Sequence, residues 1–133
     1  MKTHPRRILF VLLGFIIIAG LFFFFIDKRG NIFSGAGLPL QTGKVVIEMY
    51  RDEYTPSEIK IRQGTTVTFV NKSEVARWPA SDLHPSHGIY PEFDPRGPVA
   101  SGEEWNFTFN KTGEWTMHDH LAPYITGNIL VVE

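Results

Sequence analysis

The sequence predicts an all-β sandwich, or a small Greek-key barrel, that is preceded by one membrane-spanning helix. Two observations carry this prediction. From residue 44 onward the chain breaks into short alternating or Val/Ile-rich segments, and none of it shows ten residues of helical period. Before that point, residues 8–26 form an apolar run of 19 residues without a charge. We therefore expect one β-domain behind one apolar N-terminal segment.

The predicted strands are short and are bounded by Gly, Pro or Asn residues, as in sandwich folds. They lie at residues 44–50, 59–61, 65–71, 75–80, 104–109, 114–118 and 128–133. Aromatic side chains are expected to supply much of the core, namely Phe69, Trp78, Trp105, Phe107, Phe109 and Trp115. Because residues 105–109 alternate between aromatic and polar, three of these rings are expected on one face of a sheet.

The apolar run is long enough to span a bilayer, since 19 helical residues cover roughly 28 Å. Lys2, Arg6 and Arg7 precede it, which favours an N-terminus in the cytoplasm. A cleaved signal peptide is the alternative, but its apolar core is usually shorter. The predicted single-pass cell-membrane protein has a cytoplasmic terminus, an anchor, a flexible linker and an extracytoplasmic domain, at residues 1–7, 8–26, 27–43 and 44–133.

Composition excludes several functions. The chain contains no Cys, which rules out disulfides, Cys nucleophiles and the thiolate ligand of a blue-copper centre. Residues 1–43 hold five Lys/Arg against one Asp, whereas residues 44–133 hold eight Lys/Arg against thirteen Asp/Glu. An acidic domain repels the phosphates of nucleic acids, so nucleic acid is not expected as a partner.

Four histidines fall in two clusters within the predicted domain. His84 and His87 lie in residues 81–101, a segment without strand pattern that is long for a loop of a compact domain. His118 and His120 lie at the end of a predicted strand, where residues two apart point to the same side. Imidazole ligands from two segments suit copper or zinc. We predict that these four histidines bind a metal ion, copper, with zinc as the alternative.

Other residues near the histidines are less expected as ligands of the metal ion. Asp119 stands between His118 and His120 and is expected to point to the opposite side of the strand. Glu92 and Asp94 can add oxygen ligands, although acidic loop residues are usually only solvated. The aromatic residues expected near the site, as a shield or in the adjoining core, are Trp78, Trp115 and Tyr124.

Three segments of the chain resemble the cupredoxin family. Residues 54–71, YTPSEIKIRQGTTVTFVN, are similar to the family's opening pattern P-x-x-I-x-I-x-x-G-x-x-V-x-F-x-N. Residues 102–109 resemble the strand before the last hairpin, and residues 113–132 resemble the ligand-bearing final loop with its two strands. The resemblance covers residues 44–133 and is nearest to the cupredoxin-like domain of Efe-type iron-uptake proteins. It implies a cupredoxin-like Greek-key β-sandwich.

The ligands of a blue-copper site do not carry over from this resemblance. The final loop of blue-copper members supplies Cys, His and often Met. Those positions fall here on Asp119, on Leu121 or Ala122, and on Ile125. The upstream His of the family has a counterpart at His84. The resemblance therefore implies the fold without the electron-transfer centre.

The histidine clusters also resemble motifs of multicopper oxidases, which use cupredoxin domains. Their H-P-x-H-x-H element is similar to residues 84–89, where Ile89 replaces the last His, and their H-C-H element is similar to residues 118–120. In the oxidases the first His and the Cys face the blue-copper pocket, and the other histidines face an outer copper cluster. Carried over, this implies that His84 lies beside Asp119 in the inner pocket, while the other three histidines face outward.

Three functions are consistent with these residues. The main expectation is a membrane-anchored, extracytoplasmic metal-binding protein with an all-histidine, non-blue site. It would serve metal capture and delivery, or electron transfer with a partner protein. The alternatives are a copper redox enzyme with a type-2-like site at an oligomer interface, and a metal-free interaction module. No G-x-S-x-G, P-loop or H-E-x-x-H motif indicates another class of enzyme.

Overall fold

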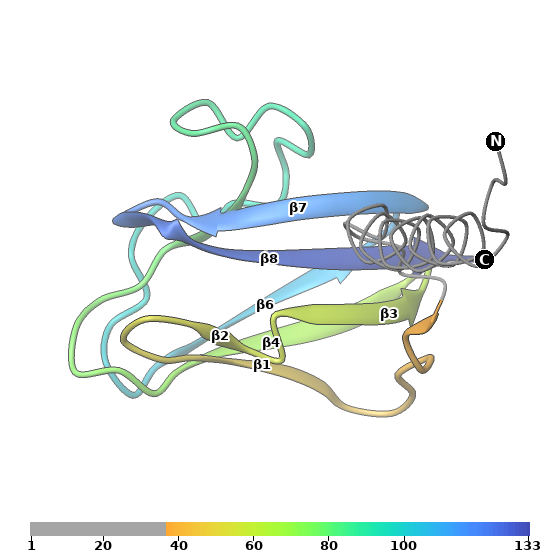
Figure 1. Ribbon diagram of the computed structural model, residues 1–133, viewed down its shortest axis with the longest axis horizontal. Helices are drawn as coiled ribbons and strands as arrows, with labels where there is room; N and C mark the ends of the chain where they lie inside the picture. The colour runs from red at the N-terminus through yellow and green to blue at the C-terminus, as the bar shows by residue number, and fades with distance from the viewer. Residues whose placement is uncertain (1–36) are drawn as a thin grey trace, which may run out of the picture. The chain divides into compact units, whose positions relative to one another are not determined.

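Two four-stranded β-sheets pack face to face in residues 37–133, the part of the chain that this computed structural model describes (Figure 1). The first sheet has the order β2–β1–β4–β6, with β1 at Val45–Met49, β2 at Tyr54–Thr55, β4 at Thr65–Asn71 and β6 at Glu104–Phe109. The second has the order β3–β8–β7–β5, with β3 at Glu58–Arg62, β5 at Pro79–Ser81, β7 at Gly113–Asp119 and β8 at Ala122–Val132. The predicted all-β sandwich is confirmed.

Each sheet contains one parallel pair of strands and is otherwise antiparallel. β1 pairs in parallel with β4, with Val45 opposite Val67, and β3 pairs in parallel with β8, with Glu58 opposite Asn128. β7 lies between β8 and β5, so both of its edges are hydrogen-bonded. Such an interior strand is a rigid platform for any side chain at its end.

β2 was not predicted, several strand ends differ by one residue, and two strands differ more from the prediction. β8 begins at Ala122 rather than at residue 128, because Gly127 lies inside a strand instead of ending a turn. A Cβ at Gly127 would lie 2.9 Å from the carbonyl oxygen of Ser57, so this close approach of two backbones needs glycine. β5 is shorter than the predicted strand at residues 75–80 and begins only at Pro79.

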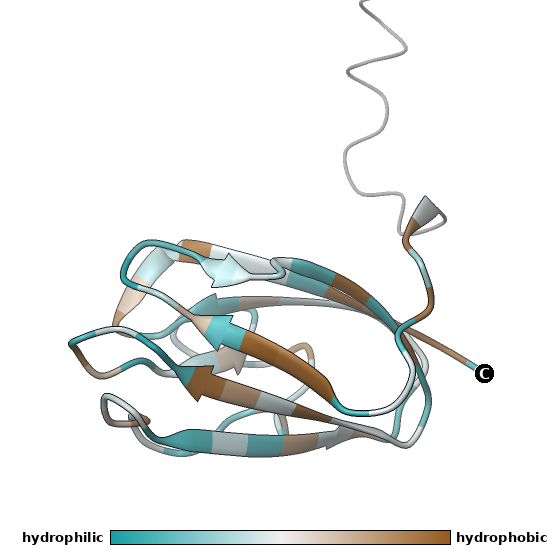
Figure 2. Ribbon diagram, turned by 90° about the horizontal axis from the view of Figure 1, so that it is seen from below, coloured by the Kyte–Doolittle hydropathy of each residue, from teal (hydrophilic) through white to brown (hydrophobic). Residues whose placement is uncertain are grey.

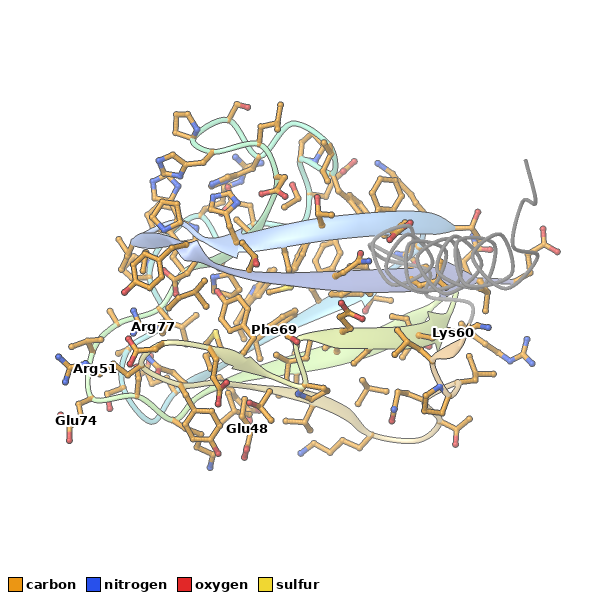
Figure 3. All side chains as sticks on the ribbon, in the orientation of Figure 1. Glu48, Arg51, Lys60, Phe69, Glu74 and Arg77 are labelled. Carbon is orange, nitrogen blue, oxygen red and sulfur yellow. The ribbon has the colours of Figure 1, made fainter. Side chains whose placement is uncertain are left out.

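The core lies between the two sheets and is built from alternate residues of the strands. On β4 the side chains of Val67 and Phe69 are fully buried, and Phe69 lies between the two layers in Figure 3. Figure 2 shows apolar and polar residues alternating along some strands, whereas others have continuous apolar stretches. Trp105 and Phe107, expected in the core, are partly buried and pack against it. Burying one large apolar side chain stabilises a fold by about 1.5–3 kcal/mol.

The long loop between β5 and β6 adds two aromatic rings to this core. Tyr90 is 2% exposed and Phe93 is fully buried. The Phe93 ring centroid lies 5.5 Å from that of Phe69 and 5.0 Å from that of Phe109. Neither Tyr90 nor Phe93 was predicted to lie in the core. Their burial ties the loop, which runs above β7 in Figure 1, to the sandwich.

Part of the predicted organisation lies outside the described residues. The anchor at residues 8–26 is outside, and the linker at residues 27–43 is described only from residue 37. In that stretch Leu40 forms a parallel β-bridge with Lys60. Within residues 37–133 no helix has the length and apolar character needed to cross a membrane. The anchor and the domain boundaries stay predictions.

Candidate metal centre

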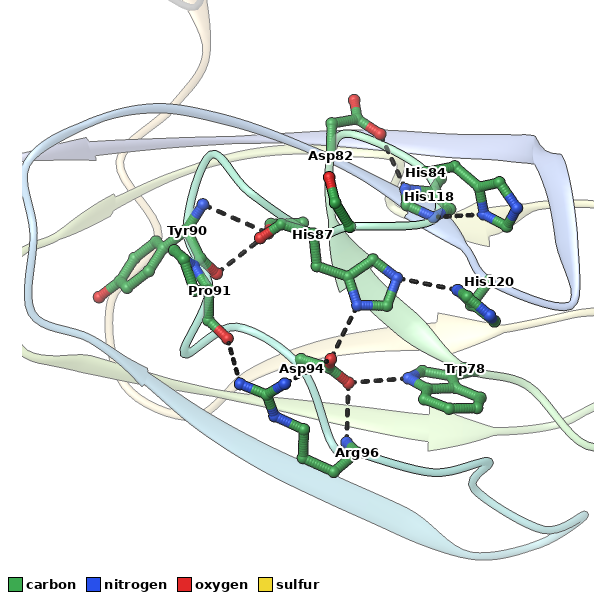
Figure 4. Close-up of polar contacts among 12 residues, drawn as sticks. Trp78, Asp82, His84, His87, Tyr90, Pro91, Asp94, Arg96, His118 and His120 are labelled. Atoms are coloured by element: carbon green, nitrogen blue, oxygen red, sulfur yellow. Dashed lines mark hydrogen bonds and ion pairs between the residues drawn. The ribbon is translucent and has the colours of Figure 1, made fainter.

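Two segments far apart in the sequence bring four histidines together at the end of β7 (Figure 4). His84 and His87 belong to the loop after β5, and His118 and His120 belong to the end of β7 and its turn. The ring centroids of His84 and His120 lie 4.8 Å apart, and those of His87 and His118 lie 5.3 Å apart. The two predicted clusters therefore form one group.

The alternation of β7 places this group on the outer face of its sheet. Met117 and Asp119 are buried on the core side, so His118 between them points to the opposite face. His118 is nevertheless only 2% exposed. The loop of residues 82–94 covers it, and this loop rises above β7 in Figure 1. The group thus lies between a rigid strand and a loop fixed to the core.

Three of the four histidines offer donor atoms close enough for one metal ion. One ring nitrogen from each of His84, His118 and His120 lies within 4.8 Å of the other two. Nitrogen ligands bind copper or zinc at about 2.0–2.1 Å, so a small inward movement of the rings would complete such a site. His84 is exposed, His118 is buried and His120 is half-buried. The group is therefore open to solvent at His84.

Asp82 fixes the orientation of the His118 ring. Its Oδ1 lies 2.8 Å from Nδ1 of His118. A carboxylate only accepts hydrogen bonds, so this Nδ1 carries the hydrogen and Nε2 keeps its lone pair. The same Nε2 lies 3.2 Å from Nδ1 of His84. A carboxylate behind an imidazole is a common support for a metal-binding histidine.

His87 lies behind His120 and is supported by its own carboxylate. Its Nε2 is 2.9 Å from Nδ1 of His120, and its Nδ1 is 2.7 Å from Oδ2 of Asp94. Trp78 and the backbone N–H of Arg96 donate to Oδ1 of Asp94 at 2.8 Å and 2.7 Å. Burial raises the pKa of Asp94, but the hydrogen bonds from these three residues outweigh it and hold the pKa below its ordinary value.

The two histidines of the β7 end are shifted toward their neutral form. Burial lowers the pKa of His118, and this effect outweighs the opposing contact with Asp82. Loss of hydration also lowers the pKa of His120, together with the nearby histidines. Since a metal ion binds the neutral imidazole, both rings are in the binding form at neutral pH.

The structure corrects the predicted position of His84. The likeness to multicopper oxidases implied that His84 lies beside Asp119 in an inner pocket, but His84 lies on the outer face with the other histidines. Asp119 is fully buried and accepts hydrogen bonds from the backbone N–H groups of Leu121 and Ala122, at 2.9 Å and 3.1 Å. Its second oxygen lies 3.8 Å from Nε of Arg77. The prediction was wrong because the inner pocket is filled by these partners of Asp119.

The two acidic residues proposed as extra oxygen ligands have other partners. Both carboxylate oxygens of Glu92 accept hydrogen bonds from Nζ of Lys111, at 2.9 Å and 3.0 Å. Asp94 contacts the ring of His87. Neither residue belongs to the group of three donor atoms within 4.8 Å of one another.

Among the three aromatic residues expected near the site, Trp78 is the one beside a histidine ring. Its ring centroid lies 4.5 Å from that of His120. Trp115 packs at 4.8 Å from Tyr90 and against the core, and Tyr124 is 74% exposed. Trp78 therefore shields one side of the site, and its predicted place in the core was wrong.

Sequence reasoning missed Asp82 as a member of the site. Asp82 stands two residues before His84, but its side chain contacts His118, which lies on another strand. The useful signal is general rather than local: a metal-binding imidazole commonly donates its second N–H to a carboxylate. This rule predicts an acidic residue near a metal-binding histidine, but only the folded structure shows which acidic residue it is.

The donor set fits copper or zinc bound by imidazole nitrogens. His84, His118 and His120 would hold the ion, and three ligands leave a coordination position for a solvent molecule or a partner's ligand. A blue-copper ion does not fit, because the chain has no Cys and because Asp119 occupies the inner position with its own partners. The site is therefore of a non-blue kind.

One curated relative was found by sequence. The chain is similar to amicyanin of Paracoccus denitrificans, with 24% identity over 97 residues, which covers 72% of this chain and 71% of amicyanin. A solved form of amicyanin has a TM-score of 0.58 with 21% identity and covers 75% of this chain and 90% of amicyanin. No family model matches the chain.

Other solved structures share the sandwich. A Cu-containing nitrite reductase from Thermus scotoductus SA-01 has a TM-score of 0.58 and 27% identity over 70% of this chain, and the chain spans only 23% of that reductase. A purple cupredoxin from Nitrosopumilus maritimus has a TM-score of 0.59 and 22% identity, over 67% of this chain and 100% of its own.

These likenesses agree with the two-sheet sandwich described above. Residues 37–133 contain a cupredoxin-like domain, and its group of three histidines fits a non-blue site. The resemblance stated from the sequence is therefore confirmed.

Proposed function

We propose that this chain is a membrane-anchored, extracytoplasmic protein that binds copper at an all-histidine, non-blue site. One observation carries the proposal: the donor nitrogens of His84, His118 and His120 lie within 4.8 Å of one another. They converge from two segments that are distant in the sequence, and Asp82 supports one of the rings. Unrelated surface histidines have no reason to share such an arrangement.

Copper is preferred to zinc for two reasons. Imidazole ligands suit both ions, but Cu(II) binds a given nitrogen site more tightly than Zn(II). The relatives are also named for copper: amicyanin is described in a Cu(I) form, and the nitrite reductase is described as Cu-containing. Zinc is the alternative ion.

The membrane anchor in this proposal is the apolar run at residues 8–26. Lys2, Arg6 and Arg7 on its N-terminal side favour a cytoplasmic N-terminus. The acidic domain and its histidines would then face the outside of the cell membrane, where they would meet metal ions before these enter the cell.

Metal capture and delivery is the use that the exposure of His84 favours. His84 is the exposed member of the group, and a ligand at the surface can exchange with a ligand of a partner protein. Electron transfer with a partner is the second candidate, because amicyanin is described both with reduced Cu(I) and in an oxidised form. Both uses need a partner protein that reaches the His84 side.

Titration of the full-length chain in detergent with Cu(II), followed by electron paramagnetic resonance, tests this proposal. We expect one ion per chain and a type-2 signal with nitrogen hyperfine structure. His118→Ala should remove this signal, whereas the matched change His4→Ala, outside the predicted domain, should not. Binding no tighter than about millimolar, or no saturation, would overturn the proposal.

A further inference from the structure

The four histidines do not have equal positions in the group. The donor atoms of His84, His118 and His120 lie within 4.8 Å of one another, and His87 is not among these three. His87 instead contacts one of them, His120, with one nitrogen, and Asp94 with the other (Figure 4). Both nitrogens of its ring already have a partner in the protein.

In the neutral form of His87 the contact with Asp94 sets the tautomer. Asp94 only accepts, so Nδ1 of His87 donates to it and Nε2 of this neutral ring is an acceptor. The atom that faces this acceptor, at 2.9 Å, is Nδ1 of His120, which then carries a hydrogen. The lone pair of His120 is then left on Nε2.

Besides His87, two residues hold Asp94 in place. Nε1 of Trp78 donates to it at 2.8 Å, and the backbone N–H of Arg96 donates at 2.7 Å. The Arg96 guanidinium adds an ion pair at 3.6 Å. The carboxylate has little freedom to turn away from His87.

The backbone of His87 is held just as firmly. Its φ of 53° lies in the left-handed region, which a residue with a side chain adopts only at a cost of about 1–3 kcal/mol. The N–H of His87 donates to the carbonyl of Leu83 at 2.7 Å, and the Ser81 hydroxyl donates to the carbonyl of His87 at 2.8 Å. His87 is 5% exposed. The loop therefore uses an unfavourable conformation to aim this ring at His120.

We propose that His87 is a positioning residue and not a metal ligand: with Asp94 behind it, it orients His120 so that Nε2 of His120 faces an ion held by three imidazoles. This inference rests on the proposed metal binding and revises our prediction of four ligands. Asp82 orients His118 by a direct contact, whereas Asp94 orients His120 through the imidazole of His87 that lies between them. The ion would thus have two ligands supported by carboxylates and a third, His84, at the surface.

The metal-bound test counts nitrogens in the full-length chain loaded with Cu(II). We expect the hyperfine structure of three coordinated nitrogens in the unchanged protein and also in His87→Ala. His87→Ala should weaken Cu(II) binding about ten- to a hundredfold, as loss of an outer hydrogen-bond partner does. His87→Gln should restore most of it, since a side-chain amide can donate to Asp94 and accept from His120. His4→Ala is the matched control and should change nothing.

Two results of that experiment would overturn the inference. One is a fourth coordinated nitrogen that disappears in His87→Ala, because His87 would then be a ligand. The other is unchanged Cu(II) affinity in His87→Ala, because the ring would then orient nothing.

A second measurement needs no metal and separates this inference from the proposed function. Nitrogen NMR of the histidine rings should show hydrogens on Nδ1 of both His87 and His120, and Asp94→Ala should change this pattern. A hydrogen on Nε2 of His120 in the unchanged protein would overturn the relay. Failure of the unchanged protein to bind Cu(II) would instead overturn the proposed function, while the NMR result still decides the relay.

Discussion

At the C-terminal end of β7, the polar side chains on the two faces of the strand differ in how fully their hydrogen-bonding atoms are paired. On the core side, Asp119 is fully buried and surrounded by donors, among them two backbone N–H groups, Arg77 and the hydroxyl of Tyr54. On the outer side, His118 contacts Asp82 with Nδ1 and His84 with Nε2, and His120 contacts His87 with Nδ1.

The difference separates a structural group from a binding group. A buried polar atom whose partners are all present stabilises one conformation and has no capacity left for a ligand. The donor nitrogens of His84, His118 and His120 lie within 4.8 Å of one another, so a cation among them could bind all three. Adjacent residues on one strand can therefore have unrelated roles.

The largest expected effect is on folding and comes from the inner face. Asp119→Ala leaves the charge of Arg77 buried without its carboxylate, and breaking a buried ion pair in this way costs about 3–5 kcal/mol. Urea denaturation of the full-length chain measures this loss in the free energy of unfolding. The exposed Glu103→Ala is the control. A loss below about 1 kcal/mol would place Asp119 among ordinary surface carboxylates.

On the outer face the large effect is on metal affinity. His120→Ala removes one of three ligands, so Cu(II) affinity should fall by more than the roughly hundredfold limit for an outer-shell change. Calorimetric titration measures it. Adding His87→Ala to this variant should cost nothing further, because His87 acts through His120. Additive losses would show that His87 contacts the ion independently.

A smaller loss of affinity is expected when the support of His118 is removed. Asp82→Ala frees the His118 ring to turn, and Cu(II) affinity should fall about ten- to a hundredfold. Glu92→Ala is the matched control, since this carboxylate of the same loop pairs with Lys111 and not with a histidine. Equal losses in the two variants would mean that only the general negative charge of the loop matters.

The smallest effect is the pH dependence of the metal-free protein. The pKa of His118 is lowered in the folded chain, so the unfolded chain takes up the proton first as the pH falls. The free energy of unfolding should therefore have its full value at pH values above 6.5, the ordinary histidine pKa. Below that pH it should decrease by less than about 1.4 kcal/mol per pH unit per group. Urea denaturation at several pH values measures this, and His118→Gln should reduce the slope. A free energy of unfolding that increases as the pH falls would contradict a lowered pKa of His118 in the folded chain.

Much of the fold follows from the sequence because its strands are short segments that alternate or are rich in Val and Ile. The segments at residues 65–71 and 104–109 are strands with the predicted bounds, since each buries one face against the core. Residues 122–127 were not predicted as strand. Their Pro and Gly indicate a turn locally, and the pairing with β7 that overrides this is a long-range contact.

The site was predicted in part for a similar reason. That His118 and His120 share a face follows from the period of a strand. That the loop folds over the outer face of β7 does not follow from any local pattern, because it depends on the burial of Tyr90 and Phe93 in the core. The positions of His84 and His87 relative to the strand, and the carboxylates that contact His87 and His118, were therefore beyond sequence reasoning.

The burial of Tyr90 and Phe93 also determines how an ion can leave. Lifting the loop off β7 would pull both rings out of the core, so the loop and the sandwich must open as one cooperative unit. A bound ion then protects the whole domain, raising its free energy of unfolding by about 2.7 kcal/mol at a hundred times its dissociation constant. Under the proposed function, ligand substitution without unfolding would begin at the exposed imidazole of His84. Such a domain would hold an ion against spontaneous loss and release it to a competing ligand.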